Sequence, residues 1–79
     1  MSKGQYTKQI IKKCSDNGIK IDTSDSHLMF FLDGYTTLPQ MKKLDDGSIM
    51  FKYSDGWEHK DITFGKDGKY SYSWGHGVI

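Results

Sequence analysis

The sequence predicts an α+β protein in which one N-terminal amphipathic helix packs on an antiparallel β-meander of about four to five strands. Three observations lead to this prediction. Apolar residues recur at helical spacing near the N-terminus, four Asp-Gly dipeptides divide the remaining chain, and aromatic residues make up 14% of the composition. Large rings suit the core of a small sheet protein. With 79 residues the chain is expected to form one domain, spanning residues 1–79.

The N-terminal helix is predicted over residues 5–17. Its apolar stripe consists of Tyr6, Ile10, Ile11 and Cys14, which fall three or four residues apart. Lysines occupy most of the opposite side, where they suit a solvated surface. Asn17-Gly18 is a helix stop, because glycine adopts the left-handed conformation at low cost.

The segment after the helix is read as extended. Ile19 to Asp22 alternates apolar and polar residues and suggests a short strand, and Thr23–Ser26 is a polar loop. His27–Asp33 contains the uninterrupted apolar run Leu28–Leu32, which is typical of a strand covered on both faces. We therefore expect His27–Asp33 to be a central strand.

The Asp-Gly dipeptides predict the turns of a meander, because glycine enters positive φ without a Cβ clash. They are Asp33-Gly34, Asp46-Gly47, Asp55-Gly56 and Asp67-Gly68. The strands expected between and after them are Leu38–Leu44, Ser48–Ser54, Trp57–Phe64 and Lys69–Trp74. Pro39 lacks an N–H group, which places the first of these strands at a sheet edge or shortens it. Leu38, Met41 and Leu44 are also spaced by three, so a helical turn is the alternative there.

Turn geometry assigns the faces of the central hairpin. A two-residue turn at Asp55-Gly56 pairs Lys52 with His59 and Met50 with Asp61. The core face then holds Ile49, Phe51, Tyr53, Ile62 and Phe64, and the helix stripe should pack on it. The outer face holds Met50, Lys52, Trp57, His59, Asp61 and Thr63.

The last hairpin has two possible registers. A three-residue loop of Lys66, Asp67 and Gly68 pairs Phe64 with Tyr70 and puts the aromatic residues of the last strand on the core face. A two- or four-residue loop moves Tyr70, Tyr72 and Trp74 to the outer face beside Trp57, because a one-residue slip inverts a strand. We favour the three-residue loop, since it builds one coherent core.

Composition narrows the function classes. The net charge is +1 and no arginine is present, which disfavours a nucleic-acid mimic, a strong nonspecific nucleic-acid binder and base-specific DNA recognition. Cys14 is the single cysteine, so an intramolecular disulfide is excluded and a reducing environment is expected. The longest apolar run is far shorter than a membrane span, and the first residues do not read as a secretory signal. We expect a cytoplasmic protein without a membrane interaction, located in the host cytoplasm if a phage encodes it.

Few residues are arranged for chemistry. His27, His59 and His76 lack the spacing of a zinc site, so neither a metal nor a cofactor is expected. Cys14 lies near a helix C-terminus, where the dipole raises a thiol pKa and disfavours a nucleophile. The pair His59 and Asp61 shares a strand face, with Lys52 beside it, and could support general acid–base chemistry on a phosphodiester.

The leading hypothesis is a non-enzymatic protein-binding module. By analogy of style, we expect an inhibitor of host machinery encoded by a phage or mobile element, of the anti-defence or anti-CRISPR kind, that occupies a partner's surface. Its predicted binding residues are Met50, Lys52, Trp57, His59, Asp61 and Trp74. One alternative is a single-stranded nucleic-acid-binding protein, whose affinity would fall steeply with salt. The other is a small nuclease-like enzyme using His59 and Asp61, whose activity would be lost in His59→Ala.

Overall fold

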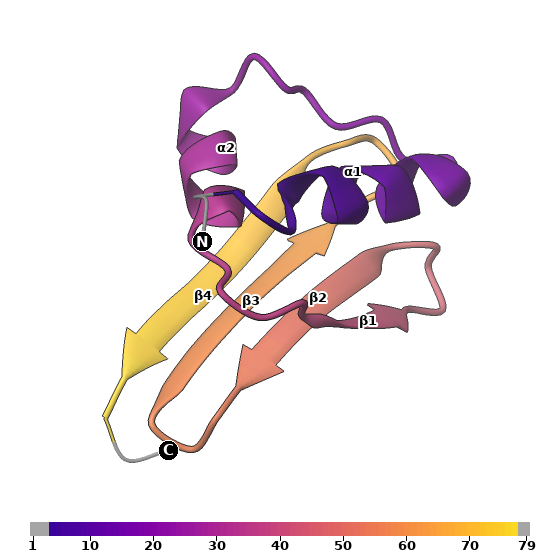
Figure 1. The fold of residues 1–79 in the computed structure, drawn as a ribbon. Coiled ribbons are helices and arrows are strands. Elements are labelled where there is room, and N and C mark those ends of the chain that lie inside the picture. Colours follow the sequence, from indigo (N-terminus) through magenta and orange to yellow (C-terminus); the bar gives the residue numbers. More distant parts are fainter. Residues whose placement is uncertain (1–3, 78–79) are drawn as a thin grey trace.

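Two helices pack on one face of a four-stranded antiparallel sheet in the computed structural model, which describes residues 4–77 (Figure 1). In chain order the elements are α1 (Thr7–Asp16), α2 (Ser26–Asp33), β1 (Gln40–Lys43), β2 (Ile49–Ser54), β3 (Glu58–Phe64) and β4 (Tyr70–His76). The strands follow one another in the sheet in the order β1-β2-β3-β4. The predicted α+β class and the antiparallel meander are confirmed.

Helix α1 forms where the apolar stripe predicts it. Ile10 and Cys14 are fully buried, and the lysine-bearing side is mostly exposed. The helix ends at Asn17-Gly18 as expected, with Gly18 at a φ of +79°. The Gly18 N–H donates to the Ser15 carbonyl at 3.0 Å and the Ile19 N–H to the Cys14 carbonyl at 2.9 Å, which is the hydrogen-bond pattern of a Schellman cap.

The prediction of a central strand at His27–Asp33 is wrong, because these residues form α2. The buried positions Leu28, Phe31 and Leu32 stand at i, i+3 and i+4, which is one face of a helix. Asp25 caps the helix, with its Oδ1 accepting the Leu28 N–H at 3.1 Å. Asp33-Gly34 is consequently a helix end and not a hairpin turn.

The prediction of a short strand at Ile19 to Asp22 is also wrong. This segment joins no sheet, yet Ile19 and Ile21 are buried in the core. The alternation of apolar and polar residues thus reflects a loop that lies along the core. Within Leu38–Leu44 the structure has strand β1 and not a helical turn, at the sheet edge that Pro39 predicts.

The β2–β3 hairpin differs in register from the prediction by two residues. Ser54 lies opposite His59, because Gly56 and Trp57 form the two-residue loop in place of Asp55 and Gly56. The Asp55 N–H donates to the Glu58 carbonyl at 3.1 Å and closes this turn. A shift of two residues preserves the face of every side chain, so the predicted faces of β2 and β3 are confirmed.

The β3–β4 hairpin has the predicted three-residue loop. The Gly65 N–H donates to the Lys69 carbonyl at 2.8 Å, and Gly68 is left-handed with a φ of +83°. The register pairs Phe64 with Tyr70, Ile62 with Tyr72 and Lys60 with Trp74. The aromatic side chains of β4 are therefore on the same face of the sheet as the core.

The core lies between the helices and this face of the sheet. Its buried residues are Ile10, Cys14, Ile19, Ile21, Leu28, Phe31, Leu32, Tyr35, Ile49, Phe51, Ile62 and Phe64. The Tyr35 hydroxyl donates to the Lys60 carbonyl at 2.9 Å and ties the chain after α2 to β3. Neither helix has the length and apolar character needed to cross a membrane within residues 4–77.

Candidate interaction surface

The helices leave part of the core face of the sheet uncovered. Figure 1 shows α1 and α2 over the half of the sheet where β3 ends and β4 begins. Ile62 and Phe64 are fully buried in this half, whereas Tyr72 is 48% and Trp74 57% exposed on the same face. We name Tyr72, Trp74 and His76, which alternate along β4 on this face, the aromatic strip.

The aromatic strip is held by helix α2 at one end. The Tyr72 ring lies 4.8 Å from the Phe31 ring, measured between centroids, and its hydroxyl is 2.9 Å from His27 Nε2. Farther along, the Trp74 and His76 rings meet edge to face at 5.4 Å. The strip therefore runs from a ring packed on the helix to an indole that is mostly in solvent.

Lys60 places a positive charge at the base of the strip. It lies opposite Trp74 in the sheet register, and its Nζ is 4.4 Å from the Phe31 ring centroid and 5.2 Å from that of Tyr35. Burial lowers the pKa of Lys60, while the charge of Glu58 opposes this shift. The ammonium group is thus partly desolvated and held against aromatic faces, which stabilise a cation.

The outer face of the sheet brings together four of the predicted binding residues: Met50, Lys52, His59 and Asp61. Lys52 lies opposite Asp61, and His59 Nε2 is 3.2 Å from Ser73 Oγ on β4. Asp61 Oδ1 is buried without a hydrogen-bond partner in the described chain. This face is polar, and its His59–Asp61 pair remains the candidate acid–base group of the nuclease-like alternative.

The two tryptophans of the prediction stand apart from that group. Trp74 is on the opposite face of the sheet, as the three-residue loop requires. Trp57 lies in the turn before β3 and is 63% exposed. Its carbonyl accepts the Gly77 N–H at 2.8 Å, so its backbone is at the same end of the sheet as the end of β4.

Sequence reasoning missed that Tyr72 and Lys60 belong to an exposed surface. The alternation of aromatic and small residues from Tyr70 to Trp74 shows which side chains share a face. It does not show how far two short helices extend over that face. Because His27–Asp33 was predicted as a strand, the short cover of about 12 Å that an eight-residue helix provides could not be predicted.

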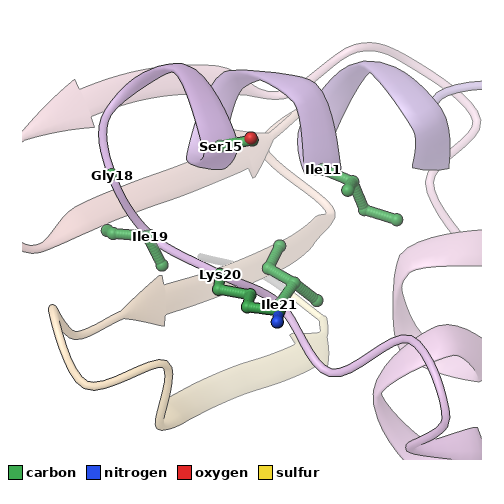
Figure 2. A pocket seen from close by; sticks show the side chains of 6 residues that line it. All are labelled: Ile11, Ser15, Gly18, Ile19, Lys20 and Ile21. Carbon is green, nitrogen blue, oxygen red and sulfur yellow. The ribbon is translucent and has the colours of Figure 1, made fainter.

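The chain also has a shallow depression beside α1. Figure 2 shows its lining residues, which come from α1 and the segment that follows the helix: Ile11, Ser15, Gly18, Ile19, Lys20 and Ile21. The lining is mainly aliphatic and has one ammonium and one hydroxyl group. Within residues 4–77 no three acidic, histidine or cysteine side chains are grouped as a metal site would require.

No protein-family model matches the chain, and neither a curated protein nor a solved structure was found to be similar to it. The fold and its exposed surface thus define a small α+β protein with a half-covered sheet.

Proposed function

We propose that the protein is a protein-binding module that docks its partner on the aromatic strip. The observation that supports this proposal is the exposure of Tyr72 and Trp74 on the face that elsewhere forms the core. Tyrosine and tryptophan are enriched in protein interfaces and supply much of their binding energy. Exposed aromatic side chains that continue the core face form the type of apolar patch that marks protein interaction sites.

The aromatic strip also suits partner binding because its side chains are held in place before a partner arrives. Tyr72 is fixed by its ring contact with Phe31 and by the hydrogen bond of its hydroxyl with His27. Side chains that are already ordered lose less conformational entropy when a partner arrives. Tyr72 therefore serves as a rigid platform, and the more exposed Trp74 as the anchor that enters a pocket of the partner.

Lys60 defines the polar part of the partner's surface. Its ammonium group is partly desolvated beside the strip and lies opposite Trp74 in the register. A carboxylate of the partner placed next to Lys60 would be attracted to its positive charge. Charge complementarity of this kind selects partners and fixes their orientation. The partner is thus expected to combine an apolar pocket with an acidic group at its rim.

The mode of action in this proposal is occupation of a partner's surface. The module acts as an inhibitor of host machinery, encoded by a phage or mobile element and of the anti-defence kind. A preordered aromatic surface supports blocking of a partner by contact.

Single-stranded nucleic acid is the second candidate ligand. Tyr72 and Trp74 follow each other on one face, and bases stack on such rings with a nearby cation such as Lys60. The net charge of +1 weighs against this candidate, because polyanion binding draws on many positive charges.

The test is capture of ligands from a lysate of the native host by the tagged protein, with and without nuclease treatment. We expect a stoichiometric protein that survives nuclease treatment and is lost in Trp74→Ala. The outer-face variant Lys52→Ala should retain it. Recovery of nucleic acid alone, with binding that falls steeply as salt rises, would replace the proposal with the second candidate.

A further inference from the structure

We propose that β4 pairs antiparallel with β4 of a second copy of this chain, so that the two sheets become continuous across a two-fold axis. β4 is the last strand of the sheet order and pairs with β3 on one side. This inference goes beyond the proposed function. It concerns the hydrogen-bonding groups at the edge of the sheet, and the association it predicts can be measured with the purified protein alone.

The backbone of β4 alternates between groups bonded to β3 and groups that point away. The hydrogen bonds from Gly65 N–H to Lys69 and from Gly77 N–H to Trp57 mark the bonded pairs at the two ends of the ladder. In an antiparallel ladder every second residue is bonded to the neighbouring strand, so the residues that point outward are Tyr70, Tyr72, Trp74 and His76. Within residues 4–77 their outward N–H and C=O groups meet no backbone partner.

The two edges of the sheet differ in their protection. Edge strand β1 contains Lys42 and Lys43 and follows Pro39, and lysine and proline are the residues that usually discourage edge-to-edge pairing. Strand β4 has neither of them and contains no aspartate or glutamate over its seven residues. No like charges therefore oppose the pairing of this edge with an identical one.

The length of β4 selects the register. Ser73 is the central residue of Tyr70–His76, so a two-fold axis at Ser73 uses every residue of the strand in both copies. Tyr72 then lies opposite Trp74 of the second copy, and Tyr70 lies opposite its His76. These are the outward-bonding residues of both strands, as an antiparallel ladder requires.

The pairing extends the aromatic strip. In this register the side chains that share a face within each copy also share it across the axis. Tyr72 and Trp74 of the two copies become one platform between the two pairs of helices, with aromatic cross-strand pairs that favour association. Two paired strands of seven residues form a small interface, and small interfaces are typical of weak association, so a concentration-dependent dimer is expected.

The first test is disulfide trapping. Ser73 lies on the outer face and meets its own equivalent in a non-hydrogen-bonded pair, where Cβ atoms are about 4.5–5.5 Å apart and a short movement gives disulfide geometry. Under mild oxidation, Ser73→Cys should form a covalent dimer, while Ser71→Cys, which would face Gly75 of the second copy, should not. The native Cys14 is fully buried and does not compete.

The second test weakens the dimer by placing like charges at the two-fold axis. Ser73→Lys places two ammonium groups next to each other at the axis, whereas Ser71→Lys places none. Sedimentation should show a concentration-dependent dimer for the unmodified chain, a dissociation constant at least tenfold weaker for Ser73→Lys and a smaller change for Ser71→Lys, with circular dichroism unchanged. A monomer at all concentrations up to about 1 mM, or equal behaviour of the two positions in both tests, would overturn the inference.

Discussion

Ile62 and Tyr72 lie directly opposite each other on β3 and β4, yet Ile62 is fully buried and Tyr72 is 48% exposed. The two side chains share a face, so the difference arises from what lies above them. Phe31 of α2 contacts the Tyr72 ring, and beyond it no helix of residues 4–77 covers the face. The boundary of the core thus runs across this pair and defines where the aromatic strip begins.

The turns before and after β3 provide a matched test of backbone conformation. Gly56 and Gly68 have φ angles of +87° and +83°, but a Cβ at Gly68 would lie 2.8 Å from the Lys20 carbonyl oxygen, while one at Gly56 would meet open space. Gly56→Ala should cost about 1–2 kcal/mol of unfolding free energy from the left-handed conformation alone. Gly68→Ala should cost more in urea denaturation. Equal costs would show that the contact with Lys20 is relieved without strain.

Asp25 links the start of α2 to the start of β4. Its Oδ1 caps the helix at the Leu28 N–H, and its Oδ2 accepts the Tyr70 hydroxyl at 3.0 Å. Asp25→Ala should lower the unfolding free energy by about 0.5–2 kcal/mol for the cap, with a further loss from the hydrogen bond to the Tyr70 hydroxyl. Thermal and urea denaturation would measure this.

The control for Asp25 is Asp16, which forms an exposed ion pair with Lys12 at 3.2 Å. Exposed pairs of this spacing contribute about 0.3–0.5 kcal/mol, so Asp16→Ala should change stability little. A loss in Asp16→Ala as large as that in Asp25→Ala would contradict the assignment of Asp25 as a cap.

Cys14 should be chemically inert in the folded protein. Burial raises the pKa of its thiol to about 12, and the residue is fully buried on the apolar stripe of α1. We expect very slow reaction with a thiol-specific reagent at pH 8 and fast reaction once urea unfolds the chain. Rapid stoichiometric labelling without denaturant would mean that α1 opens readily from the sheet.

Acid should destabilise the fold through the aspartates of its turns. Hydrogen bonds from Ser24 lower the pKa of Asp22, those from Ser48 lower that of Asp46, and those from the Glu58 and Trp57 N–H groups lower that of Asp55. A lowered folded pKa contributes stability above the unfolded pKa, and this contribution is lost as the pH falls through the folded value. The urea concentration at the unfolding midpoint should therefore decrease as the pH is lowered below about 4. Asp55→Asn should reduce this pH dependence, and an unchanged profile would contradict the role of Asp55.

Much of the fold could be predicted from local chemistry. The spacing of Ile10 and Cys14 and the stop at Gly18 predict α1, and the Asp67-Gly68 turn predicts the register of β4. These features depend on neighbouring residues alone. The β2–β3 register was missed by two residues because the Asp55 side chain accepts the Trp57 and Glu58 N–H groups, which places Gly56 and Trp57 in the loop.

The strand prediction for His27–Asp33 failed because five consecutive apolar residues carry no periodicity that separates a strand from a buried helix. The capping residue Asp25 was the local signal for a helix. The exposed aromatic strip could not be predicted for a different reason. The strand register determines on which faces of the sheet Lys52 and Trp74 lie. The exposure of Tyr72 depends instead on how much of the sheet helix α2 covers.

The most direct test of the proposed docking surface compares the two faces of the sheet by titration calorimetry with the captured partner. Trp74→Ala removes the anchor of the aromatic strip, and Lys52→Ala alters the outer face. The account predicts at least about tenfold weaker binding for Trp74→Ala and nearly unchanged binding for Lys52→Ala, with both variants folded. Binding that tolerates Trp74→Ala and is lost in Lys52→Ala would place the partner on the outer face and contradict the account.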